Sequence, residues 1–253
     1  MTGRRRAALL WTLAAVGLAG PLAVVGVVAA THSPATVPLV VAGGVPADVP
    51  AVVPEVPPAP TAADPAADPY AAWASEVGAR TGIPPRALTA YAAAEVRLTA
   101  ERPGCGLSWV TLAGIARVES DHGRHGGRVL DADGRPDRPI VGVALDGSPG
   151  VAAIADTDGG ALDGDPVWDR AVGPLQFLPS TWDTYGVDGD RDGVAEPQDL
   201  DDAALAAGRY LCAAGGDLST GDGWWRAVLA YNPSAEYARD VLDGANAYAE
   251  RSR

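Results

Sequence analysis

The sequence contains no lysine: all 19 basic residues are arginine, against 32 acidic residues. Together with the abundance of alanine and glycine, this absence is typical of a coding bias and indicates no binding function. The formal net charge is −13 at pH 7. Because Lys and Arg side chains that neutralise phosphates supply most of the affinity for nucleic acid, this balance argues against a nucleic-acid partner. A neutral glycan remains compatible with it.

Cysteine is scarce too, with only Cys105 and Cys212 in the chain. An even number of cysteines in an exported protein favours a disulfide, and we expect these two residues to be joined. Two buried thiols are the alternative. In the chain-entropy model, closing a loop of roughly 100 residues adds about 4–5 kcal/mol of stability.

The N-terminus has the pattern of an export signal. Three arginines at residues 4–6 precede an uncharged apolar run over residues 7–30,. At about 1.5 Å per residue this run is long enough to cross a bilayer of roughly 30 Å. Small residues at its end also offer a cleavage site, so residues 1–30 are predicted as either a signal peptide or an N-terminal membrane anchor. In both cases the body is exported to the cell wall or the extracellular space.

Composition divides the rest of the chain into two parts. Residues 31–69 alternate Pro with Ala and Val and carry four acidic residues, which predicts a disordered, extended linker,. Residues 70–253 hold 16 basic and 28 acidic residues and are long enough to form one domain with a full core,.

The body is predicted to be mainly helical. Residues 123–172 are rich in Gly, Asp and Pro, which predicts an irregular insertion with a small hairpin,. Apolar periodicity and helix-start signals predict helices elsewhere: from Pro84 and Pro85 to about Ala100, from Ser108 (as N-cap) to Ser120, and over Ser180–Tyr185, Ala203–Ala213, Gly223–Tyr231 and Ala235–Ala249,.

An acid occupies a position where an apolar helical face should continue. The apolar residues at three- and four-residue steps are Trp109, Leu112, Ile115 and Ala116,. The next position is Glu119. Burial raises the pKa of a carboxyl group towards neutrality, which makes a general acid. The alternative is a partly solvated acid paired with Arg117 or Arg124.

Two further segments carry groups that suit a sugar ligand. The first, Gly173–Trp182, places the amide of Gln176 next to a flexible glycine and a Trp,. The second, residues 230–233, joins Tyr231 to Asn232, with Tyr237 shortly after. Taken singly, these residues are better explained as core aromatics and helix caps.

In this combination and order the chain resembles the lytic transglycosylases of the membrane-bound type B group, in the lysozyme-like superfamily. The resemblance covers essentially all of residues 70–249. It rests on the opening at residues 82–84, on Gly104–Trp109, Leu112–Gly123, Asp156–Gly160, Asp169–Trp182, Ala203–Cys212 and Ala230–Tyr237. The family usually has Met where Leu175 stands, a substitution that conserves volume.

The resemblance implies a lysozyme-like catalytic domain with roles for particular residues. Glu119 matches the single catalytic acid. The predicted substrate-binding residues are Ser120, Gln176, Phe177, Tyr231, Asn232 and Tyr237. The implied reaction cleaves the β-1,4 bond between N-acetylmuramic acid and N-acetylglucosamine of peptidoglycan without water, to leave 1,6-anhydromuramoyl ends. One Glu acts as acid and then as base, no cofactor is required, and any membrane contact is through the N-terminal segment.

Alternatives to this reading remain open. A hydrolytic muramidase of the same fold would leave reducing sugar ends instead. A non-catalytic, calcium-stabilised wall-binding module would keep the groove without the reaction. A second catalytic Asp from residues 123–172 is a further option, and the sequence names no protein partner.

A run of acids after the fourth predicted helix matches the calcium loop of an EF-hand. Counting from Asp188, acids fall at positions 1, 3, 5, 9 and 12 with Gly193 at position 6,. The predicted ligands are Asp188, Asp190, Asp192, Val194, Glu196 and Asp199. Asp at position 12, where Glu is usual, predicts weak affinity for a structural calcium ion. A solvated acidic turn is the alternative.

Three other patterns are less specific. His122 and His125 lack a third zinc ligand and are expected to be surface or cleft residues,. The acids at 156, 158, 163 and 165 have no standard metal spacing. The pair Trp224 and Trp225 precedes an apolar helix and is expected in the core.

Overall fold

The computed structural model describes residues 49, 50, 56 and 68–253. The predicted N-terminal segment and most of the predicted linker lie outside these residues. Val56, from the linker, is 4% exposed and packs with the helical core. In the described part of the chain, no helix combines the length and the apolar character needed to cross a bilayer.

The described residues contain seven helices, and their β structure is limited to isolated bridges. The predicted mainly helical class is therefore confirmed. The helices are α1 (Ala71–Thr81), α2 (Pro85–Glu101), α3 (Trp109–Ser120), α4 (Pro179–Tyr185), α5 (Leu200–Gly215), α6 (Gly221–Tyr231) and α7 (Ala235–Arg251). The sequence reasoning did not recognise α1 as a helix.

Nearby side chains cap the N-termini of three helices, and a residue of α2 caps the N-terminus of α3. Asp199, Thr220 and Ser234 each accept a backbone N–H in the first turn of α5, α6 and α7,. Ser108 precedes α3 as predicted, but its side chain makes no capping hydrogen bond. The Glu95 carboxylate of α2 accepts the N–H of Trp109 instead. A negative charge is favourable at this positive end of the helix dipole.

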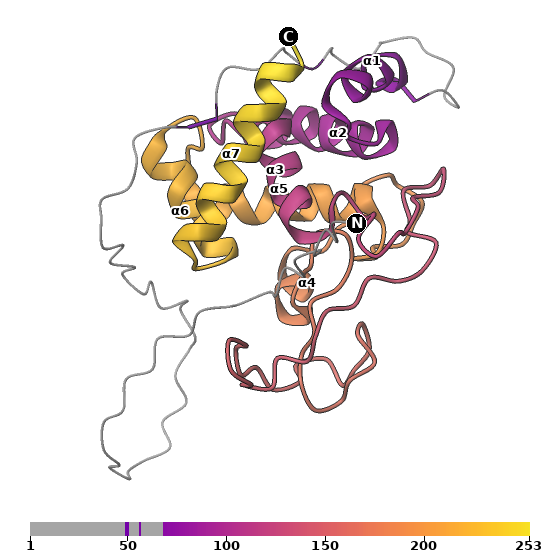
Figure 1. The fold of residues 1–253 in the computed structure, drawn as a ribbon, viewed down its shortest axis with the longest axis vertical. Coiled ribbons are helices and arrows are strands. Elements are labelled where there is room, and N and C mark those ends of the chain that lie inside the picture. Colours follow the sequence, from indigo (N-terminus) through magenta and orange to yellow (C-terminus); the bar gives the residue numbers. More distant parts are fainter. Residues whose placement is uncertain (1–48, 51–55, 57–67) are drawn as a thin grey trace, which may run out of the picture.

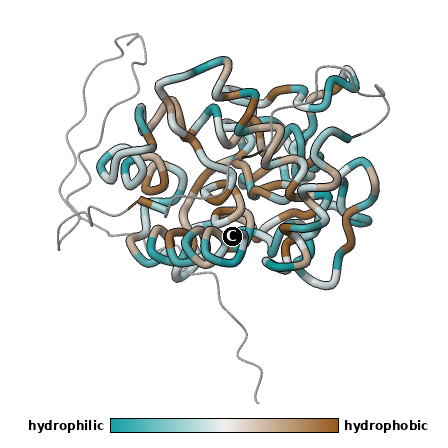
Figure 2. The backbone as a smooth tube through the Cα atoms, turned by 90° about the horizontal axis from the view of Figure 1, so that it is seen from above, coloured by the Kyte–Doolittle hydropathy of each residue, from teal (hydrophilic) through white to brown (hydrophobic). Residues whose placement is uncertain are grey.

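Helix α3 lies in the middle of the core and is buried without interruption from Trp109 to Ala116. It packs closely against α7 because Gly114 has no side chain: a Cβ there would lie 2.6 Å from the carbonyl oxygen of Val241. Hydrophobic residues accordingly gather towards the centre of the molecule, and hydrophilic residues follow its outline (Figure 2). The end of α3 is thereby held in a fixed place.

The chain between α3 and α4 is irregular, as predicted for residues 123–172. Turns and isolated antiparallel bridges, such as Ala155 with Trp168, stabilise it. Figure 1 shows this segment looping outside the packed helices, on the side where α4 lies. The segment begins shortly after α3, whose last turn carries Glu119.

A disulfide joins Cys105 to Cys212, with 5.4 Å between their Cα atoms. This confirms the predicted pairing, and the alternative of two buried thiols is wrong. The bond ties the loop between α2 and α3 to the last turns of α5.

Candidate active site

Glu119 lies in the last turn of α3 and is half-buried. The hydroxyl group of Tyr237, from α7, donates a hydrogen bond of 2.6 Å to its Oε1. Burial raises the pKa of Glu119 to about 7, although the bond from Tyr237 acts in the opposite direction. At neutral pH this side chain is thus present both as an acid and as a base, which suits general acid–base catalysis.

The turn after Glu119 is bent by three successive residues with positive φ. These are Asp121 at 52°, His122 at 58° and Gly123 at 82°. The first two carry side chains, for which this region is uncommon. These residues end α3 directly after Glu119 and Ser120.

Two side chains hold this turn in place. Ser120 is 1% exposed; its hydroxyl donates to the carbonyl oxygen of Pro174 at 2.5 Å and accepts the N–H of Gly123 at 2.8 Å. His122 is fully buried, with its ring nitrogens 3.1 Å from the Tyr91 hydroxyl and 2.8 Å from the Tyr248 hydroxyl. Burial lowers the pKa of His122 to about 3, so the ring is neutral.

The expected place of His122 on the surface or in a cleft is therefore wrong. Both of its ring nitrogens have tyrosine partners, so neither is available to a metal. His125, in contrast, is exposed.

The Gly173–Trp182 segment folds against the end of α3. Gly173 has φ 78°, and a Cβ there would overlap the carbonyl group of Pro197, so no other residue fits,. Gln176 has φ 49°, and its Nε2 donates to the carbonyl oxygen of Gly173 at 3.0 Å. Tyr231 donates to the carbonyl oxygen of Leu175 at 2.7 Å. The bond from Tyr231 joins the segment that carries Gln176 to α6, and both form one cluster with Glu119, since burial and, second, the charge of Glu119 raise the pKa of Tyr231.

The predicted substrate-binding residues differ in their accessibility. Gln176, Tyr231 and Asn232 are half-buried, and the Oδ1 atom of Asn232 accepts no hydrogen bond from the protein. The structure does not place Ser120 and Phe177 at the surface: Phe177 is 2% exposed, with its ring against Trp182 and Tyr231. The side chains of these two residues are packed inside the fold, where they support the residues of the cluster.

Sequence reasoning missed two aromatic residues beside this cluster. The ring of Tyr210, on α5, lies 5.6 Å from that of Tyr231 and 5.0 Å from that of Tyr185. Both Tyr185 and Tyr210 are half-buried. Neither belongs to a local motif, and only the packing of α4, α5 and α6 brings them together, so no sequence signal could have found them.

The acidic loop before α5 gathers a different set of carboxylates from the predicted one. One oxygen each of Asp188, Asp190 and Asp202 lies within 4.8 Å of the others. Asp202 was not predicted as a ligand, because it lies beyond the last position of the 12-residue pattern, in the first turn of α5. Asp199 forms a second such group with Asp190 and Asp201.

Two of these acids are buried: both oxygens of Asp202 accept backbone N–H groups, from Gly189 and Glu196, whereas Asp199 accepts one, from Asp201. Asp199 is 0% exposed and Asp202 is 1% exposed, and burial raises their pKa values to about 7 and about 6. The Oδ2 atom of Asp199 accepts no hydrogen bond from the part of the chain that the structure describes. Oxygen ligands that have lost their water in this way fit a divalent cation such as calcium.

The other predicted ligands face an arginine. The guanidinium of Arg135, from the irregular insertion, contacts Asp192 at 3.1 Å, Glu196 at 3.2 Å and Asp199 at 3.3 Å. Val194, which would contribute its backbone carbonyl oxygen, is 50% exposed,. The predicted six-ligand scheme is therefore divided between two places.

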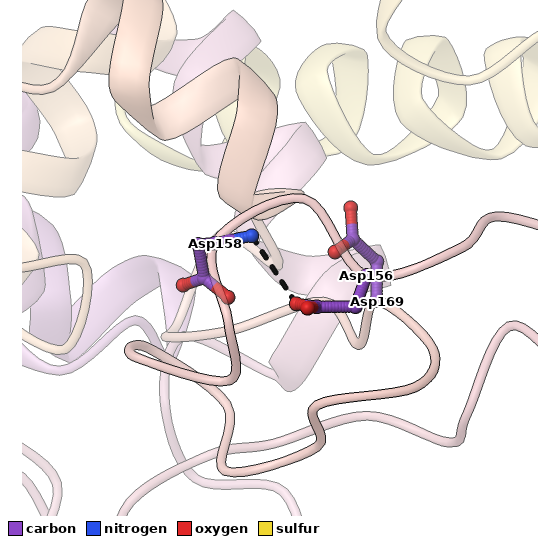
Figure 3. A group of neighbouring side chains, drawn as sticks. All are labelled: Asp156, Asp158 and Asp169. Atoms are coloured by element: carbon purple, nitrogen blue, oxygen red, sulfur yellow. Dashed lines mark hydrogen bonds between the residues drawn. The ribbon is translucent and has the colours of Figure 1, made fainter.

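A second acidic cluster lies in the insertion and consists of Asp156, Asp158 and Asp169 (Figure 3). Its oxygens are used within the protein: Asp156 accepts the N–H of Asp158 at 3.2 Å, and Asp169 accepts from the backbone and hydroxyl of Thr157. The acids at 163 and 165 also accept backbone N–H groups. These bonds account for the acids as turn-forming residues.

Two cavities are found away from Glu119. One of about 450 Å³ lies in the insertion beside Arg170, and one of about 740 Å³ lies between α2 and the acidic loop. Glu119 lines neither of them.

Trp224 and Trp225 are 0% and 3% exposed, which confirms that they belong to the core.

The chain matches a known protein family over part of its length. Residues 165–228, which include Gln176 and Phe177 but neither Glu119 nor Tyr231, match the family model described as "Transglycosylase SLT domain". No curated protein matches the chain.

Among solved structures, the chain is similar to the Escherichia coli lytic transglycosylase Slt35. The complex with bulgecin A has a TM-score of 0.41 and 16% identity, covering 74% of this chain and 80% of that one. The complex with calcium has a TM-score of 0.40 and 15% identity, covering 71% and 78%. At these values the similarity establishes neither the activity nor the ligands of this chain.

Proposed function

We propose that this protein is a lytic transglycosylase that cleaves the glycan strands of peptidoglycan. The observation that carries the proposal is Glu119, a half-buried carboxyl group with a pKa of about 7 that is contacted by Tyr237. The family match over residues 165–228 supports it independently, since that segment supplies Gln176 to the same cluster.

One carboxyl group is sufficient for the proposed reaction. Protonated Glu119 donates to the oxygen that bridges N-acetylmuramic acid and N-acetylglucosamine, while an oxocarbenium-like centre forms at C1 of the muramoyl residue. The resulting carboxylate then takes the proton of that residue's C6 hydroxyl, whose oxygen bonds to C1. The product has a 1,6-anhydromuramoyl end, and no water is consumed.

The surroundings of Glu119 agree with this single-acid scheme. The influences resolved on its pKa within residues 68–253 are burial and Tyr237, and no carboxylate is among them. A paired nucleophile, such as the retaining glycosidases use, would lie about 5–5.5 Å away and would raise this pKa further.

Neighbouring residues would bind the sugars. The Gln176 amide offers an acceptor oxygen for a sugar hydroxyl or acetamido N–H, and the buried Oδ1 of Asn232, which has no hydrogen-bond partner among the described residues, would be a second acceptor once substrate binding exposes it,. The half-buried ring of Tyr231 provides an apolar face for a sugar ring,. Ser120 and Phe177 act through the backbone of the Gly173–Trp182 segment, because they are buried.

A calcium ion in the acidic loop would have a structural role. Asp188, Asp190 and Asp202 would hold it, and it would stabilise the connection between α4 and α5,. The reaction itself requires no cofactor. Export by the N-terminal segment, with or without retention as an anchor, would bring the enzyme to its substrate outside the cytoplasmic membrane.

Mass spectrometry of purified sacculi digested with the protein tests the reaction. We expect muropeptides with 1,6-anhydromuramoyl ends, which are lighter by one water molecule than the hydrolytic products. Reducing muramoyl ends would instead identify a muramidase. Binding to sacculi without any soluble fragment would identify a wall-binding module.

Replacing Tyr237 by phenylalanine tests the role of its contact with Glu119. The lost hydrogen bond had stabilised the carboxylate, so the pKa of Glu119 should rise,. Because the reaction begins with protonated Glu119, the alkaline limb of the kcat/KM profile, expected near pH 7, should move to higher pH.

The matched control for this variant is Tyr231→Phe. It removes a hydroxyl from the same cluster, but that hydroxyl donates to Leu175 and not to Glu119. Its alkaline limb should stay in place. A Tyr237→Phe limb that is unmoved, or that moves to lower pH, would contradict the assignment of Glu119 as the acid.

A further inference from the structure

The acidic loop and the start of α5 carry more negative charge than one metal ion can balance. Arginines outside the loop contact four of these acids: Arg86 pairs with Asp201, and Arg135 contacts three others. The seven acids are Asp188, Asp190, Asp192, Glu196, Asp199, Asp201 and Asp202. The three acids without an arginine are the ones whose oxygens converge within 4.8 Å, namely Asp188, Asp190 and Asp202.

Arg135 therefore occupies a cation position of its own. It contacts Asp192, Glu196 and Asp199, which stand at positions 5, 9 and 12 of the EF-hand pattern,. In a calcium loop of that type these positions serve the metal. Here a guanidinium group holds them.

Asp199 lies beside both Arg135 and Asp190, an acid of the proposed calcium site. Its side chain is fully buried, and its Oδ2 lies 3.3 Å from Arg135 without a hydrogen bond. One of its oxygens also lies within 4.8 Å of Asp190 and Asp201 oxygens. A carboxylate placed between two cation positions serves one of them at the expense of the other.

The arginine comes from a turn that is fixed to the helical body. The backbone N–H of Arg135 donates to Asp131 at 2.9 Å, and Leu130 and Pro136 form an antiparallel bridge around it. The carbonyl oxygen of Gly134 accepts the N–H of Leu200, at the start of α5. Arg135 is thus presented to the loop in a defined position and not as a free surface side chain.

We propose that Arg135 is a resident counter-ion of the acidic loop and competes with calcium for Asp192 and Asp199. The proposal rests on the calcium site of the proposed function but not on the glycan reaction. It explains why only part of the EF-hand ligand set converges. It implies that the loop of this protein binds calcium weakly because of a residue some fifty positions earlier in the chain.

Isothermal titration of the full chain with calcium chloride tests the proposal. Arg135→Gln should bind calcium at least about tenfold more tightly than the wild type, because a positive charge next to the metal is removed and two carboxylates are released. Arg138→Gln is the matched control: it removes the same charge three residues away, where the side chain is 59% exposed and forms an ion pair with Asp137. Its affinity should equal that of the wild type.

Asp190→Ala identifies the site, since it should abolish the binding that Arg135→Gln strengthens. An affinity that is unchanged or reduced in Arg135→Gln would overturn the proposal. Absence of binding in the wild type and in Arg135→Gln alike would remove the calcium site as well. The sacculus experiment measures the glycan reaction separately, so neither result decides it.

Thermal unfolding tests the competition even if Arg135→Gln is less stable than the wild type. In chelator the variant should melt below the wild type, because three acids lose their partner. Added calcium should raise its melting temperature more than that of the wild type, since tighter binding to the folded state stabilises it more. Equal shifts in the two proteins would contradict the competition.

Discussion

Replacing Glu119 by glutamine should reduce the release of soluble muropeptides from sacculi by a factor on the order of 10³ or more. Glutamine has nearly the shape of the glutamate and can still accept the hydrogen bond from Tyr237. It can neither donate the proton to the bridging oxygen nor remove one from the C6 hydroxyl. Both proposed steps are lost together, so the residual activity should show no dependence on a group with a pKa near 7.

The stability of this variant separates lost chemistry from lost structure. Burial raises the pKa of Glu119 from 4.5 to about 7, so the folded state binds a proton that the unfolded state releases. The free energy of unfolding therefore falls as the pH rises from about 4.5 to 7, and glutamine removes this loss. At pH 8 the Glu119→Gln protein should melt at the same temperature as the wild type or at a higher one.

Asp121→Asn is the control for removing an acid at the same turn. Asp121 is exposed and pairs with Arg124, so its loss should leave the rate nearly unchanged,. Normal clearance of sacculi by Glu119→Gln would exclude Glu119 as the acid. If Glu119→Gln melts well below the wild type, its lower rate would not distinguish lost chemistry from lost structure. The pH profile of Tyr237→Phe would then test the role of Glu119.

The features that sequence reasoning predicted depend on short-range patterns. Six helices follow from apolar periodicity, proline at a helix start and capping residues, all of which act within one or two turns. Glu119 was found in the same way, as an acid that interrupts an apolar face. The disulfide followed from the number of cysteines and the expected compartment.

The features that were missed depend on contacts between distant segments. Arg135 lies 57 residues from Asp192, and no motif joins them. Asp202 lies near Asp188 and Asp190 because the first turn of α5 packs against the acidic loop. The capping of α3 by Glu95, the burial of His122 and the place of Tyr210 likewise depend on which helices pack together.

Helix α1 was missed for a different reason. Its apolar residues are mostly alanine, as in the linker before it, so composition separated the two poorly. The buried side of α1 becomes evident only when it packs on α2.

Removing the disulfide should have the largest effect on stability among the changes considered. In the double variant Cys105→Ala, Cys212→Ala the free energy of unfolding should fall by about 4–5 kcal/mol, because the unfolded chain is no longer closed into a loop of roughly 100 residues. For a domain of this size the melting temperature should fall by roughly 10–20 °C. Urea unfolding followed by tryptophan fluorescence measures the first quantity, and calorimetry measures the second.

Reduced wild-type protein is the comparison that isolates the covalent bond. Both cysteines are about 5% exposed or less, so the alanine variant also loses buried sulfur, whereas the reduced protein keeps it. The reduced protein should therefore lie between the oxidised wild type and the double variant. A loss below about 1 kcal/mol on reduction would show that the denatured chain keeps these segments together without the bond. At a temperature where the double variant is still folded it should cleave sacculi, because α7 and the end of α3 hold Glu119 and Tyr237 without help from the loop after α2.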